Sequence, residues 1–160
     1  MSKIEIPAGA VLQYIKDRFE GKKVTEALSP TGNWMEFTLD SIEKGKATVS
    51  LNVKKDMTNP YGNIHGGMMA VVMDETIGWA VVSLDTANHY TSLNLNVDFL
   101  YAIKEGDRLK AVSEVIRVGK KIIHVECRVY DSKGALAGKA TSNLIVTGMK
   151  PVDGDYKVAN

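Results

Sequence analysis

The sequence is poor in the features that mark disulfide-bonded, nucleic-acid-binding and membrane proteins. Its 160 residues include one cysteine, so no intrachain disulfide can form and a reducing compartment is expected. The formal net charge of +1 gives no electrostatic reason to expect nucleic acid or an anionic membrane as a partner. The N-terminus has no uninterrupted apolar run typical of signal peptides or membrane spans. We therefore expect a soluble cytoplasmic protein of one domain.

Motifs for cofactors and metals are missing as well. The chain has no glycine-rich phosphate loop, no Gly-x-Ser-x-Gly nucleophile elbow and no dinucleotide-binding fingerprint. His65, His89 and His124 are not spaced like metal ligands. The lone Cys127 falls in a row of alternating apolar residues, which predicts core packing. We expect neither a metal nor a cofactor.

Apolar periodicity predicts one long helix and about six strands. Residues 65–84 form a long apolar run that favours a buried helix, and Asp74 and Glu75 in its middle argue against a membrane span. Residues 11–19 predict an N-terminal helix that ends near Gly21. We expect this helix to lie on the surface and to cover the mouth of the functional site. Such a pattern favours an α+β fold with a sheet wrapped around a central helix.

The remaining segments alternate between strands and loops. Residues 22–33 are expected to be a loop, and the tail from Met149 is expected to be loosely held. Turns are predicted at Lys44-Gly45, at Gly119-Lys120 and at residues 132–134. The segments expected to be strands are 35–39, 47–53, 93–99, 107–118, 121–131 and 135–147.

The most informative segment is the loop 59–67, Asn-Pro-Tyr-Gly-Asn-Ile-His-Gly-Gly, which leads into the apolar run. A helix N-terminus offers unpaired backbone N–H groups and a partial positive charge, which suit a polarised carbonyl. Asp74 stands among apolar residues of the same run. A carboxylate is costly there unless it is paired or used, so we expect Asp74 to be buried and functional.

Together, these residues resemble the hotdog-fold acyl-CoA thioesterases, in their PaaI-like and THEM2-like branch. The pattern is Asn-x-x-Gly-x-x-His-Gly-Gly, with Asp74 seven residues after the second glycine. The resemblance continues through residues 91–100, Gly106-Asp107 and Gly119-Lys120, and covers roughly residues 30–148. It implies a single hotdog thioesterase domain over residues 1–160, with an antiparallel sheet around one long helix. It also implies a homodimer at minimum, with two dimers forming a homotetramer.

The resemblance assigns catalytic roles to five residues in the hydrolysis of an acyl-CoA. Asp74 is the general base or the nucleophile, and both roles stay open. Gly66 polarises the thioester carbonyl through its N–H, Asn59 positions the thioester or the nucleophile, and His65 orients the loop. Ser92 helps to hold the attacking water, although simple strand alternation would also fit an exposed serine.

Five further residues are expected to bind substrate. Gly67 lies beside Gly66 at the helix start, and Glu75 could share or replace the role of Asp74. Arg117, Lys120 and Lys121 cluster at a predicted hairpin, where cations suit the phosphates of coenzyme A.

Spacing gives a separate reason to expect a dimer. Asp74 lies eight residues beyond Gly66, which is about 12 Å along a helix axis. One helix therefore cannot bring both groups to the same carbonyl. An antiparallel helix from a two-fold partner would do so.

Two other functions remain open at this point. A hotdog dehydratase or hydratase would act on the acyl α and β carbons, and it favours a His–Glu or Asp–His pair. A non-catalytic acyl-CoA-binding protein would use the same pocket, usually beside an output domain. The loop with Asp74 fits hydrolysis better than either.

Overall fold

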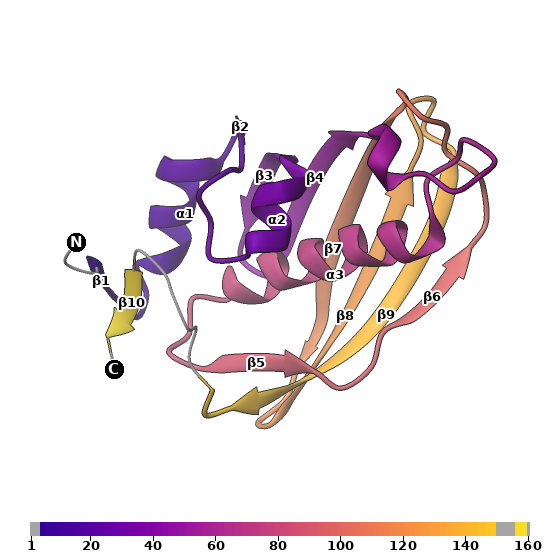
Figure 1. Ribbon diagram of the computed structural model, residues 1–160. Coiled ribbons are helices and arrows are strands. Elements are labelled where there is room, and N and C mark those ends of the chain that lie inside the picture. The colour runs from indigo at the N-terminus through magenta and orange to yellow at the C-terminus, as the bar shows by residue number, and fades with distance from the viewer. Residues whose placement is uncertain (1–3, 150–155, 160) are drawn as a thin grey trace.

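A curled antiparallel sheet packs around one long helix, α3 (Gly66–Val82), in the computed structural model, which describes residues 4–149 and 156–159 (Figure 1). The predicted sheet wrapped around a central helix is confirmed. Along the sheet the order is β2 (Lys22–Lys23), β3 (Thr38–Glu43), β4 (Lys46–Asn52), β7 (Arg108–Val118), β8 (Ile122–Tyr130), β9 (Leu136–Thr147) and β5 (His89–Ser92), and β6 (Asn96–Phe99) also pairs with β9.

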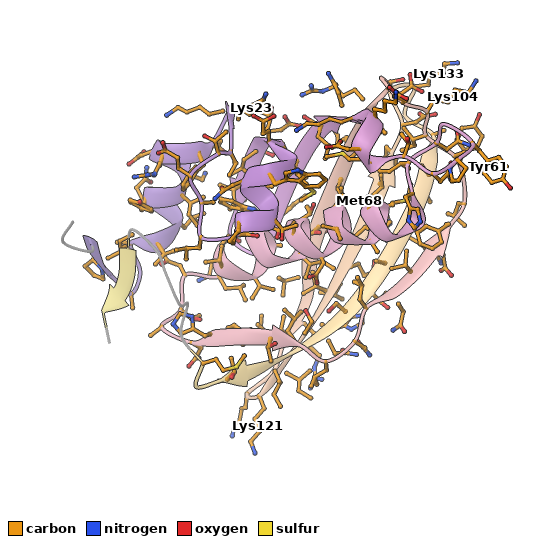
Figure 2. The ribbon with its side chains drawn as sticks, viewed as in Figure 1. Lys23, Tyr61, Met68, Lys104, Lys121 and Lys133 are labelled. Atoms are coloured by element: carbon orange, nitrogen blue, oxygen red, sulfur yellow. The ribbon has the colours of Figure 1, made fainter. Side chains whose placement is uncertain are left out.

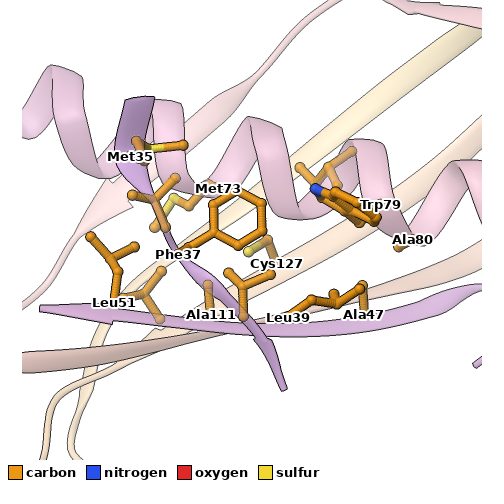
Figure 3. Packing of buried hydrophobic residues seen from close by; sticks show 14 of the residues in the cluster. Met35, Phe37, Leu39, Ala47, Leu51, Met73, Trp79, Ala80, Ala111 and Cys127 are labelled. Atoms are coloured by element: carbon orange, nitrogen blue, oxygen red, sulfur yellow. The ribbon is translucent and has the colours of Figure 1, made fainter. Parts of the chain in front are cut away.

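The side of α3 that faces the sheet forms the centre of the core. Met69, Met73 and Ile77 are buried there, and Figure 3 shows Met73 and Cys127 of β8 in the same cluster of buried residues. Gly138 of β9 allows α3 to lie close to the sheet, because a Cβ at that position would stand 2.8 Å from Met73 Cε and 2.9 Å from Met69 Sδ. Cys127 is buried as predicted, and burial raises the pKa of its thiol to about 11. A thiol with that pKa is protonated and unreactive at neutral pH.

Helix α1 (Val11–Phe19) confirms the predicted N-terminal helix. It packs at the C-terminal end of α3, where the ring of Phe19 meets Trp79 edge-on at 5.5 Å. Asp85, just after α3, accepts hydrogen bonds from the backbone N–H groups of Gly9 and Val11 at 3.1 and 2.8 Å. Figure 1 shows α1 at the opposite end of α3 from the glycine-bearing loop. The expectation that α1 covers the mouth of the site is therefore wrong.

The segment predicted as a loop over 22–33 contains β2 and a second helix, α2 (Pro30–Met35). Ser29 caps this helix and Pro30 opens it, which is the favoured order at a helix start. Met35 consequently belongs to α2, not to the predicted strand over 35–39. Glu36 ends the helix in a left-handed conformation, with φ of 54°.

The strand predicted over 93–99 is interrupted between β5 and β6. Both pieces pair with β9, and residues 93–95 between them are not in a strand, although the N–H of Leu93 still donates to the carbonyl of Asn143 at 2.8 Å. The side chain of Asn94 takes the place of a backbone partner, and its Oδ1 accepts from the N–H of Asn143 at 2.8 Å. Side-chain bonding of this kind competes with the sheet ladder.

The two ends of the described chain lie together. Strand β1 (Ile4–Pro7) pairs in parallel with β10 (Tyr156–Ala159). Most of the tail that was predicted to be loose, residues 150–155 and 160, lies outside the described residues.

The 3₁₀ turn η1 (Lys55–Met57) precedes the glycine-bearing loop. Within the described ranges, no helix is long and apolar enough to cross a membrane.

Candidate active site

The loop before α3 is held in one shape by its own hydrogen bonds. Asn59 Oδ1 accepts from the N–H groups of Tyr61 and Asn63 at 3.0 and 3.2 Å. The loop is also tied to its neighbours, since the N–H of Ile64 donates to the carbonyl of Ile103 at 2.7 Å. The side chain of Asn59 thus shapes the loop in this chain.

Helix α3 begins with a histidine cap. His65 Nδ1 accepts a hydrogen bond from the N–H of Gly67 at 3.0 Å. In a neutral ring the proton is then on Nε2. The N–H of Gly67 is therefore engaged, whereas no hydrogen bond of the described residues uses the N–H of Gly66. Of the two glycines, Gly66 keeps the available donor.

The ring of Phe99 lies against Gly66. A Cβ on Gly66 would stand 3.2 Å from Phe99 Cζ, and the backbone of Gly66 is not left-handed. Phe99 comes from β6 and is 56% exposed, so its ring forms an open wall beside the helix start. The absence of a side chain at Gly66 therefore allows other groups to come close to its backbone, and it is not needed to relieve backbone strain.

An open groove of about 500 Å³ lies beside the middle of α3. It brings together Asp74, Glu75 and Ser92 of the predicted site, and Ser92 Oγ lies 3.4 Å from Asp74 Oδ1. The residues that line it are Thr31, Ala70, Val71, Asp74, Glu75, Ser92, Leu93, Asn94 and Leu95. Asn59, His65, Gly66 and Gly67 do not line it.

Asp74 is exposed in the single chain, so the prediction that it is buried is wrong. Apolar residues occur on every side of α3, but only the side with Val72, Met73 and Ile77 meets the sheet. Asp74 points away from the sheet and shares its side of the helix with Gly78, which is also exposed.

Glu75 is half-buried and is held by a residue from α2. The Ser29 hydroxyl donates a hydrogen bond to Glu75 Oε1. Burial raises the pKa of Glu75, the bond from Ser29 lowers it, and the charge of Asp74 raises it further, so that the net direction is upward. The groove therefore has two adjacent carboxyl groups in unlike surroundings.

The three predicted phosphate-binding cations stand apart from the groove in one chain. Arg117, Lys120 and Lys121 are exposed at the hairpin between β7 and β8. Figure 2 shows Lys121 at the tip of this hairpin, well away from Met68 of α3. Among the described residues no group of His, Cys, Asp and Glu is arranged to hold a metal ion.

Sequence reasoning missed three contributors to the site. Thr31 and Ser29 were placed in a loop, although a serine before a proline is a recognisable helix start. Phe99 was read as one member of an alternating row. No local signal indicates that its ring lies against Gly66, because that contact depends on where pairing with β9 places β6 relative to α3.

Comparison with known proteins points to one family. The family model described as thioesterase superfamily matches residues 61–137. The chain is 33% identical over 93 residues to the 1,4-dihydroxy-2-naphthoyl-CoA hydrolase of Listeria monocytogenes, covering 57% of this chain and 74% of that protein. It is 24% identical over 131 residues to human acyl-coenzyme A thioesterase 13, covering 79% of this chain and 89% of that protein.

A solved structure shows the same fold. The PaaI protein of the E. coli phenylacetic acid degradation operon superposes with a TM-score of 0.73, covering 88% of this chain and 94% of that one. The identity is 18%, so the likeness concerns architecture alone.

Proposed function

The chain belongs to the thioesterase superfamily, in agreement with the resemblance of its glycine-bearing loop, and we propose that it hydrolyses acyl-CoA thioesters to the free acid and coenzyme A. The observation that carries the proposal is the Asp74 carboxylate beside the Ser92 hydroxyl, at 3.4 Å, on the wall of a groove. Names of relatives support the coenzyme A ester as the substrate class, since both curated relatives are described as acting on such esters.

The chemistry follows from three residues. Gly66 donates its free N–H to the carbonyl oxygen, where negative charge develops as the carbon becomes tetrahedral. Asp74 takes a proton from water that attacks the carbonyl carbon, with Ser92 holding that water. The C–S bond then breaks, and the proton passes to the departing thiolate. In the other route Asp74 attacks directly, and water hydrolyses the resulting anhydride.

We propose that each site is shared by two subunits. In one chain, Gly66 does not line the groove that holds Asp74, and about 12 Å of helix separates the two residues. The exposed side of α3, with Ala70, Asp74 and Gly78, has small side chains that allow a second helix to approach closely. A two-fold dimer would place Gly66 of the partner subunit beside Asp74. Two such dimers would form the expected homotetramer.

Arg117, Lys120 and Lys121 are then proposed to bind the phosphates of coenzyme A from the β7–β8 hairpin. Their exposure leaves them available for a phosphate in solution. Gly67, whose N–H is taken by His65, would support the helix start and leave the carbonyl to Gly66.

A panel of acyl-CoA esters tests the function. Release of free thiol, measured with a thiol reagent, is the expected result for at least one ester. A change at the α and β carbons without thiol release would identify a dehydratase or hydratase instead. Binding of the esters with neither reaction would identify a non-catalytic acyl-CoA-binding protein.

A further inference from the structure

Ser29 and Glu75 form a contact between α2 and α3 that the proposed hydrolysis does not use. The Ser29 hydroxyl donates to Glu75 Oε1 across 46 positions of sequence. Glu75 belongs to the wall of the groove, and Ser29 is the cap of α2. A hydrogen bond to a carboxylate is stronger than one between neutral groups, so this contact can hold two elements together.

Ser29 also fixes the first turn of α2. Its Oγ accepts from the N–H of Gly32 at 3.1 Å while its hydroxyl donates to Glu75. Gly32 leaves room for the carboxylate, because a Cβ there would lie 2.9 Å from Glu75 Oε2. Both carboxylate oxygens therefore lie against the start of α2.

The two ends of α2 are anchored differently. At its C-terminal end, Met35 is fully buried in the core. At its N-terminal end, the bond from Ser29 to Glu75 is the one hydrogen bond that joins residues 29–35 to α3, within the part of the chain that the structure describes. Gly32 in the first turn is also buried, and two hydrogen bonds join Ala27 to Asn33. Loss of the Ser29 bond would therefore loosen the first turn and leave the rest of α2 in place.

Thr31 lies in the end that this bond holds, and it is the α2 residue that lines the groove. We infer that the hydrogen bond from Ser29 to Glu75 holds Thr31 against the groove and thereby limits the size of the acyl group that the groove accepts. This inference rests on the proposed hydrolysis of acyl-CoA esters. Ser29 is a positioning residue, since it acts on the substrate through α2.

The test compares the parent protein with Ser29→Ala and Ser29→Thr, on straight-chain acyl-CoA esters from acetyl to palmitoyl. Ser29→Ala is expected to lower KM about tenfold for esters longer than the parent accepts well, the scale on which a pocket restricts size. Its kcat for the shortest good substrate stays within about threefold of the parent. Ser29→Thr keeps the hydroxyl and is expected to show the same dependence on acyl-chain length as the parent. Ser41→Ala, an exposed serine of β3, is the matched control.

Two results would overturn the inference. One is a chain-length profile of Ser29→Ala that is identical to that of the parent. The other is an equal loss of activity on all chain lengths together with a lower melting temperature, which is what loss of a helix cap alone would produce.

A binding measurement distinguishes failure of the proposed hydrolysis from failure of the inference about Ser29. Acyl-CoA thioethers, which cannot be hydrolysed, are titrated calorimetrically into the parent and Ser29→Ala. If the parent hydrolyses no ester, the proposed function is wrong, and the size preference in Kd still decides the role of Ser29. A size preference of Ser29→Ala equal to that of the parent contradicts the inference in this measurement too.

Discussion

Ser92 Oγ stands 3.4 Å from Asp74 Oδ1, although β5 ends at Ser92 and Asp74 belongs to the central helix. Directly after Ser92 the regular strand stops, and Leu93, Asn94 and Leu95 line the same groove as the two residues. A separation of 3.4 Å is long for an O–H···O hydrogen bond. The two oxygens are therefore placed to share a water or a substrate atom more readily than to bind each other firmly.

Asp74→Asn should abolish most of the turnover. The amide keeps the size of the side chain but can neither accept a proton nor attack a carbonyl, so kcat should fall about 10²-fold or more. Because Asp74 is exposed in the single chain, the melting temperature should change little. Glu114→Asn, at an exposed carboxyl of β7, is the control. A folded Asp74→Asn protein with parental kcat would transfer the role to Glu75.

Ser92→Ala should have a smaller effect than Asp74→Asn. Loss of one neutral hydroxyl near the attacking water is expected to lower kcat about three- to tenfold, the scale of a single modest hydrogen bond. KM should stay close to the parental value, since the hydroxyl is proposed to act on the attacking water and not on the acyl-CoA itself. Steady-state kinetics give both constants, and a loss as large as that of Asp74→Asn would make Ser92 a second essential group.

Substitutions at Gly66 should be graded by size. Ala places its Cβ 3.2 Å from Phe99 Cζ, and the exposed ring can yield by that amount. Val adds two further carbons at the place where the carbonyl must approach, so kcat should fall at least about tenfold. The backbone of Gly66 is not left-handed, so strain does not account for a loss. Circular dichroism and melting curves accompany the kinetics.

Gly148→Val is the control for that series, because no atom lies within 4 Å of a Cβ at Gly148. Its kcat should equal that of the parent. If Gly66→Val is as active as Gly148→Val, the polarising donor lies elsewhere.

Mixed dimers should recover activity from two variants that are each strongly impaired alone. In a hybrid of Asp74→Ala and Gly66→Val chains, one shared site is intact and the other is doubly defective. Random pairing makes about half of the dimers hybrids, so activity should reach roughly a quarter of the parental value after co-refolding. A substitution of Asn59 is less suitable than Gly66→Val as the second variant, since the side chain of Asn59 also holds its own loop in shape.

Subunit exchange is verified by native mass spectrometry on chains of different mass. A mixture that exchanges fully but is no more active than its two parents would mean that each site is built within one chain.

Glu75→Gln should change how stability depends on pH. The unfolded chain loses the Glu75 proton at its ordinary pKa of 4.5, whereas the folded chain keeps it to higher pH because burial raises the pKa. Between these two values the folded state binds more protons, so the contribution of Glu75 to the free energy of unfolding falls as pH rises. Glutamine does not titrate and lacks this decline.

The measurement is the melting temperature of both proteins from about pH 4 to about pH 8. The melting temperature of Glu75→Gln minus that of the parent should rise as the pH increases above about 4.5. It should stop rising above the raised pKa of Glu75 in the folded state. Parallel curves, or a difference that moves in favour of the parent, would contradict the assigned direction.

Much of the fold followed from periodicity in the sequence. The long apolar run predicted α3, and alternation predicted the strands that became β4, β7, β8 and β9. Alternation failed over 93–99, because Asn94 pairs through its side chain with Asn143, far along the sequence. It also failed at Met35, because a cap at Ser29 outweighed the apolar spacing that followed.

Residue identity by itself determined the family, the glycine-bearing start of α3 and the candidate base Asp74, because each depends on short spacings along the chain. Tertiary structure alone decided that Ser92 reaches Asp74 and that Ser29 holds Glu75, because each contact joins two elements that are separate in the sequence. It also decided that Asp74 faces outward. The physical reason is that apolar residues are spread around every side of α3, so the sequence does not show which side the sheet covers.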